Sequence, residues 1–144
     1  MYPVSAVLAN DEIMLTIKAG QHGSTYGGNP LACAIAKTSL DVLIEENMIE
    51  NAENMGNILR KSLKDMNSPI VGDIRGKGLL SAMVIESNKE GTNAWDVCLA
   101  LKDEGLLVKN THGNVIRMAP PLVINEEEIS HCIDIIGNVL KKFE

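Results

Sequence analysis

The sequence predicts an α/β fold, and three observations support this class. Apolar residues recur at spacings of three and four over 30–46, 50–65 and 129–143, which is typical of amphipathic helices. Residues 70–85 and 106–118 instead contain short apolar runs interrupted by glycines or turn residues, as expected for strands, and the glycines in 70–85 predict a bulge or a sharp turn. The order of these patterns places two consecutive helices before a β-α-β-β-α arrangement.

The N-terminal part is predicted to contain a short strand, a short helix and a loop. Residues 2–9 form an apolar, β-leaning run that suits a buried strand, and 11–18 could form a helix that ends before Gly20. Residues 20–30 contain four glycines among polar residues, so we expect a loop. Asn29 and Pro30 then have the types favoured at a helix N-cap and at its first helical position.

The remaining elements follow from caps and turn signals. Asn93 is predicted to cap a helix that stops at Gly105, and 111–114 is the turn of a hairpin between 106–109 and 115–118. Asn125 and Glu128 have the spacing of a capping box at the start of the last helix. The best internal boundary lies between the first two long helices, which gives domains at 1–47 and 48–144.

Composition excludes several classes of function. The formal charge of −6 argues against a nucleic-acid partner, and no apolar stretch approaches the roughly 20 residues that cross a bilayer. No metal is expected, because no Cys-x-x-Cys or paired-histidine spacing occurs. The three cysteines are expected to be buried free thiols. Such thiols fit the cytoplasm or the mitochondrial matrix, and the sequence does not decide between these compartments.

The loop at 23–29 is the first candidate site. Its glycines allow backbone N–H groups to face an anion, Ser24 and Thr25 add hydroxyl donors, and a helix N-terminus follows. These features favour phosphate. A glycine-rich connection without a ligand is the alternative, since the segment matches no Walker or dinucleotide pattern. His22 is expected to make a structural hydrogen bond.

Two arginines are candidate anion contacts. Arg75 lies before Gly76-Lys77-Gly78, where a salt bridge at a strand bend is the favoured interpretation. Arg117 projects from an otherwise apolar strand ahead of Ala119-Pro120-Pro121, so it needs a carboxylate partner from the protein or from a substrate. The residues alone leave both sources open for Arg117.

Four blocks of the sequence are distinctive: YPVSAVL at 2–8, HGSTYGGNPL at 22–31, RGKGL at 75–79 and IRMAPPL at 116–122. In the same order, these blocks resemble the class-III pyridoxal-phosphate-dependent aminotransferases. The resemblance runs through essentially the whole chain, and the residues between the blocks resemble enzymes that use ornithine more than those that use acetylornithine or 4-aminobutyrate as the amino donor.

This resemblance implies part of a fold-type-I enzyme, with a remnant of the large cofactor domain followed by the small C-terminal α/β domain. It implies a homodimer in which Ser24 and Thr25 bind the phosphate of pyridoxal 5′-phosphate (PLP) in the partner subunit's site. It also implies that Arg117 holds an active-site glutamate and binds substrate carboxylate. Amino acids and 2-oxo acids are the substrates that the family uses.

The resemblance also implies catalytic groups that this sequence does not contain. The lysine that forms the Schiff base with the cofactor lies a few residues before the Tyr-Pro pair in the family, so we expect it upstream of residue 1. No catalytic residue is therefore assigned in this chain, and the chain alone is expected to be inactive. A non-catalytic oligomerisation or binding module is the alternative from another functional class.

Overall fold

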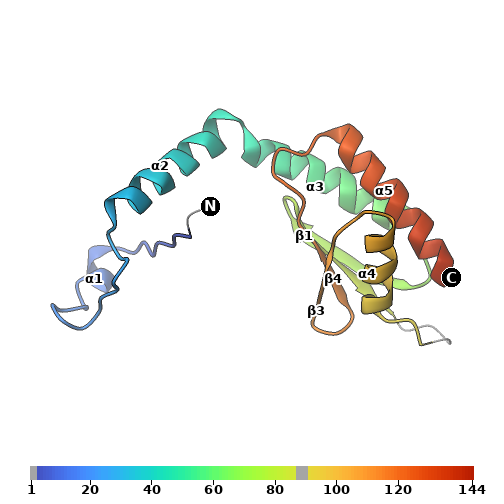
Figure 1. Ribbon diagram of the computed structural model, residues 1–144, viewed down its shortest axis with the longest axis horizontal. Coiled ribbons are helices and arrows are strands. Elements are labelled where there is room, and N and C mark those ends of the chain that lie inside the picture. Colours follow the sequence, from blue (N-terminus) through green and yellow to red (C-terminus); the bar gives the residue numbers. More distant parts are fainter. Residues whose placement is uncertain (1–2, 87–90) are drawn as a thin grey trace. The chain divides into compact units, whose positions relative to one another are not determined.

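The computed structural model describes residues 3–86 and 91–144, which form two compact units (Figure 1). The first unit spans Met1–Glu46 and the second spans Asn47–Glu144. Among the described residues, no helix combines the length and the apolar character that a membrane span requires.

The first unit contains two helices and long irregular segments. Helix α1 covers Asp11–Met14, which is shorter than the predicted helix over 11–18. Helix α2 covers Pro30–Glu45, as its cap predicts: Asn29 Oδ1 accepts a hydrogen bond from Ala32 N at 3.1 Å. Within this unit α2 has no fully buried residue.

The strand predicted over residues 2–9 is wrong. Residues 3–9 have no regular secondary structure and are exposed; Val7 and Leu8 are 84% and 90% accessible. A strand needs a neighbour to pair its backbone groups, and no segment of the described chain supplies one. The apolar side chains favour a strand, but their pattern does not show whether a neighbouring strand is present to pair with it.

The second unit is a four-stranded antiparallel sheet covered on one face by helices (Figure 1). Its strand order is β1-β2-β4-β3. The elements are α3 (Met48–Asp65), β1 (Val71–Lys77), β2 (Leu80–Ile85), α4 (Ala94–Asp103), β3 (Lys109–Thr111), β4 (Val115–Met118), α5 (Glu126–Leu140) and a 3₁₀ turn at Lys141–Phe143.

Alternation along the strands separates a buried face from an open face. Ile74, Met83 and Ile116 are 4%, 0% and 0% accessible and pack beneath the helices. Their strand neighbours Arg75, Ala82 and Arg117 point the other way, because successive side chains in a strand alternate between faces. The open face therefore carries Arg75 and Arg117, whereas Ser81, which pairs with Met118, is a buried polar residue of the other face.

Glycines act at two places in the β1–β2 hairpin, as the sequence predicts. The register shifts between Val71 and Asp73, so Gly72 lies at a bulge. Gly78 takes a φ of 52° as the first central residue of the two-residue turn that joins Lys77 to Leu80.

The capping box predicted at the start of α5 is present. Asn125 Oδ1 accepts a hydrogen bond from Glu128 N at 2.9 Å, and Glu128 Oε2 accepts one from Asn125 N at 3.0 Å. Asparagine thus takes the place of the usual serine or threonine.

Replacing Asn125 by alanine should therefore lower the free energy of unfolding by about 1 kcal/mol, because the N–H of Glu128 loses its acceptor. Urea denaturation followed by circular dichroism measures this change. Glu127→Gln is the matched control, since Glu127 lies in the same turn and outside the capping box. An Asn125→Ala midpoint equal to that of the control would contradict the role of the box.

Candidate functional site

The loop before α2 has the composition and the free donors of an anion site. No aspartate or glutamate occurs between Glu12 and Asp41, although the whole chain carries a charge of −6. Among the described residues, the backbone N–H groups of 23–26 and 28 donate to no backbone carbonyl. These groups are available to a ligand with several acceptor oxygens, such as phosphate.

Ser24 and Thr25 differ in their local bonding. Ser24 Oγ accepts a hydrogen bond from Gly27 N at 3.0 Å, which closes a turn and leaves the hydroxyl proton available to a ligand. Thr25 is exposed and its hydroxyl has no hydrogen-bond partner in the described part of the chain. Both side chains could donate to phosphate, and Ser24 would do so while holding the loop in shape.

The structure does not meet the expectation for His22. His22 is exposed, and the structure gives it no structural hydrogen bond within the described residues, contrary to the prediction. Added Cβ atoms at Gly23 and Gly28 would meet nothing within 4 Å, so the unit leaves open space around this loop.

Arg117 lies on the open face of the sheet, in the middle of β4. It pairs in register with Ala82 of β2 on one side and with Lys109 of β3 on the other. Its side chain is exposed and forms no ion pair with any described carboxylate. The charge that the sequence predicted to need a carboxylate thus has none within the described chain.

Arg75 forms the salt bridge that the sequence favoured. Its Nη1 lies 2.8 Å from Asp73 Oδ2, and both side chains are more than half exposed. The hydrogen bond from Arg75 is the main cause that lowers the pKa of the Asp73 carboxyl. Arg75 therefore has a local partner, whereas Arg117 has none among residues 3–86 and 91–144.

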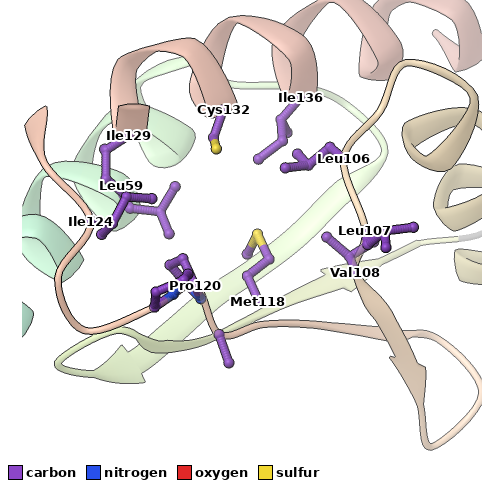
Figure 2. A pocket seen from close by; sticks show the side chains of 12 residues that line it. Leu59, Leu106, Leu107, Val108, Met118, Pro120, Ile124, Ile129, Cys132 and Ile136 are labelled. Carbon is purple, nitrogen blue, oxygen red and sulfur yellow. The ribbon is translucent and has the colours of Figure 1, made fainter. Parts of the chain in front are cut away.

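A cavity of about 260 Å³ lies on the helix-covered side of β4 (Figure 2). Side chains of Leu106, Met118, Pro120, Cys132 and Ile136 point into it, and no charged side chain lines it. It therefore suits an apolar group and cannot serve phosphate or carboxylate. Met118 lines this cavity while the adjacent Arg117 faces the opposite side of the sheet.

The cysteines correct one expectation. Cys33 is exposed, Cys98 is buried and Cys132 is half-buried, so the prediction of buried thiols is wrong for Cys33. Burial raises the pKa of Cys98, and burial together with the nearby Glu128 charge raises the pKa of Cys132. Among the described residues, no group of three His, Cys, Asp or Glu side chains could hold a metal ion.

Sequence reasoning missed two cations. Arg60 of α3 donates from Nη1 to the carbonyl oxygen of Gly78 and to Ser81 Oγ, and so ties the helix to the hairpin. Lys109 lies directly opposite Arg117, which residue types alone do not reveal. Counting outward from the predicted turn at 111–114 would have paired Lys109 with Ile116, one residue out of register, because the observed strands pair Thr111 with Val115.

Comparison with known proteins now identifies the class: the aminotransferase class-III family model matches residues 2–140, and the chain belongs to this family. The family implies PLP as cofactor, and the donors around Ser24 and Thr25 and the absence of acidic residues in their loop fit its phosphate.

Two curated relatives with high identity to the chain are both named ornithine aminotransferase. The chain is 58% identical over 143 residues to a protein named ornithine aminotransferase, mitochondrial, from Rattus norvegicus, and 57% identical over 140 residues to one of the same name from Drosophila melanogaster. These matches cover 99% and 97% of the chain but 32% of each relative. The chain thus spans about a third of the length of the curated relatives it matches.

Two solved structures of aminotransferases have the same fold as this chain. An acetylornithine aminotransferase from Elizabethkingia anophelis matches with a TM-score of 0.89 and 52% identity, over 99% of this chain and 38% of that one. The ornithine aminotransferase of Plasmodium yoelii matches with a TM-score of 0.87 and 48% identity, over 95% and 36%. The fold is therefore that of part of a PLP-dependent class-III aminotransferase.

Proposed function

We propose that this chain serves as part of an ornithine aminotransferase, which transfers the δ-amino group of ornithine to a 2-oxo acid and yields glutamate 5-semialdehyde and an amino acid. The observation that carries the proposal is the continuous match to ornithine aminotransferases at 56–58% identity over 94–99% of the chain. Bound PLP would supply the electron sink for the reaction.

The residues of this chain supply anion contacts in that proposal. Ser24, Thr25 and the free N–H groups of their loop bind the cofactor phosphate, and Arg117 binds a carboxylate of the substrate. The first domain, 1–47, belongs with the large cofactor domain, and 48–144 forms the small domain. The enzyme is a homodimer whose loop completes the partner subunit's site.

In this proposal, the covalent and acid–base steps are assigned to no residue of this chain. The compartment is the mitochondrial matrix or the cytoplasm; the rat and Drosophila relatives carry the word mitochondrial in their names.

Substrate turnover by the intact gene product that carries this chain tests the activity. With PLP present, ornithine and 2-oxoglutarate should give glutamate semialdehyde with a higher kcat/KM than N-acetylornithine or 4-aminobutyrate. Acetylornithine transfer is the second candidate, favoured by the 52% identity to the Elizabethkingia enzyme. A higher kcat/KM with N-acetylornithine would select that candidate, and no turnover of any of the three donors would refute both.

The loop assignment makes a separate prediction. Ser24→Ala combined with Thr25→Val should weaken PLP binding by roughly 100-fold or more, because two hydrogen bonds to a charged group are lost and each contributes about 1.5–3 kcal/mol. Equilibrium dialysis of the intact gene product measures the affinity. Ser39→Ala is the matched control: the Ser39 hydroxyl donates to Ile35 O at 2.8 Å within α2. Unchanged PLP affinity in the double variant would count against phosphate binding by this loop.

A further inference from the structure

The open face of the sheet carries a row of four paired residues, one from each strand, and three of them are cations. The register pairs Arg75 with Ala82, Ala82 with Arg117, and Arg117 with Lys109. Directly paired residues of an antiparallel sheet point to the same face, so these three cations share the open face. Ala82 is the small residue between Arg75 and Arg117, and it leaves room above the strand.

The cations of the sheet differ in whether a carboxylate neutralises them. Arg75 pairs with Asp73 at 2.8 Å, and Lys77 pairs with Glu53 at 3.1 Å. Lys109 and Arg117 are both exposed, and neither has an acidic partner among the described residues. The two sheet cations that no described carboxylate neutralises are therefore the two that lie directly opposite each other.

This arrangement is unfavourable for the fold alone. Like charges directly opposite on neighbouring strands destabilise a sheet, and their Cβ atoms are only about 5 Å apart. The pair becomes favourable when one anion lies between the two head groups, because each charge then faces an opposite charge. The guanidinium offers a fork of donors that matches a carboxylate, and the ammonium adds a point charge from the other side.

We propose that Lys109 and Arg117 together bind one carboxylate of the substrate, which makes Lys109 a specificity-determining residue in the site of Arg117. This inference rests on the proposed function and adds a second carboxylate ligand to it. The chemistry of the pair selects a carboxylate substrate over its amide or ester of the same shape. A protein carboxylate held by Lys109 alone is the competing interpretation, and the test separates the two.

The test uses pentanoate as a probe, since it has the carbon chain and carboxylate of ornithine without the amino groups. Inhibition of the intact, PLP-loaded gene product by pentanoate is compared with inhibition by pentanamide, its uncharged analogue. Lys109→Gln should raise the Ki of pentanoate roughly 3- to 10-fold and leave that of pentanamide unchanged. Lys109→Arg should restore most of the affinity. Lys77→Gln, whose lysine already pairs with Glu53, is the matched control.

Stability provides an independent readout. Lys109→Gln should leave the urea midpoint equal to or above that of the parent, because the substitution removes a like-charge neighbour of Arg117. A lowered midpoint with an unchanged Ki would show that Lys109 holds a protein carboxylate, and would overturn the proposal. An unchanged Ki with an unchanged midpoint would overturn it as well.

Failure of this inference is distinguishable from failure of the proposed function. If the parent protein turns over ornithine and Arg117→Gln weakens pentanoate while Lys109→Gln does not, only the role of Lys109 is lost. If the parent protein turns over none of the amino donors, the proposed function itself fails.

Discussion

Replacing Gly56 by alanine is expected to lower the free energy of unfolding of this chain by about 3 kcal/mol, at the upper end of typical overpacking costs. Gly56 is buried in the middle of α3, where that helix contacts the β1–β2 hairpin. A Cβ atom there would overlap the carbonyl oxygen and carbon of Gly78, which are backbone atoms that cannot rotate away. The helix or the hairpin would have to shift, and the bond from Arg60 to the same carbonyl would be disturbed.

Gly137→Ala is the matched control for this prediction. Gly137 is also inside a helix, α5, but an added Cβ would meet only Met66 Cε at 3.2 Å and Sδ at 3.5 Å, the flexible end of a side chain. Alanine gains up to about 1 kcal/mol of helix propensity over glycine at both positions. Urea denaturation should therefore show Gly56→Ala strongly destabilised and Gly137→Ala near or above the parent. Similar midpoints for the two variants would refute the steric explanation.

The elements that the sequence predicted correctly are those with local signals. The caps at Asn29, Asn93 and Asn125 all accept hydrogen bonds from backbone N–H groups of the first helical turn. The bulge at Gly72 and the hairpin before Val115 are likewise determined by residues close in the chain, although the first strand of that hairpin is Lys109–Thr111 and not the predicted 106–109. Local signals suffice where the stabilising partner lies within a few residues.

The predictions that failed depend on partners far away in the sequence. The expected strand at 2–9 lacks a neighbouring strand, and Cys33 lies on a helix of which no residue is fully buried within its unit. The contact between Gly56 and Gly78, and the pairing of Lys109 with Arg117, join residues whose proximity depends on packing and register. The residue types near these positions do not indicate such contacts.

In the candidate site, too, some features could be predicted from the sequence and others could not. The donors of the loop at 23–29 follow from glycines and hydroxyls that are adjacent in sequence, so the loop could be recognised before the fold was known. Whether Arg117 has a carboxylate partner could not be recognised, since any described acidic residue might have reached it across the sheet. The structure shows that Asp73 pairs with Arg75 and Glu53 with Lys77, which leaves Arg117 without a partner among the described residues.

Loss of the charge at Arg117 is expected to reduce kcat/KM for ornithine by about 100-fold in the intact gene product. Truncating one member of a charge-assisted pair typically costs about 2–5 kcal/mol when the pair is shielded from water, as a substrate carboxylate would be in a closed site. Arg117→Gln removes both the charge and the fork of donors. Arg117→Lys keeps the charge alone and should lie between Arg117→Gln and the parent.

Two comparisons separate a binding role of Arg117 from a structural one. Arg75 lies in the same row of the sheet but already pairs with Asp73. The kcat/KM of the Arg75→Gln variant should therefore change far less than that of Arg117→Gln. The urea midpoint of Arg117→Gln should not fall, because the exposed guanidinium has no described carboxylate partner and faces the like charge of Lys109. Arg117 is thus expected to weaken the fold slightly and to bind substrate strongly. An Arg117→Gln variant that unfolds more easily but keeps its kcat/KM would reverse that assignment and place the arginine among the structural residues.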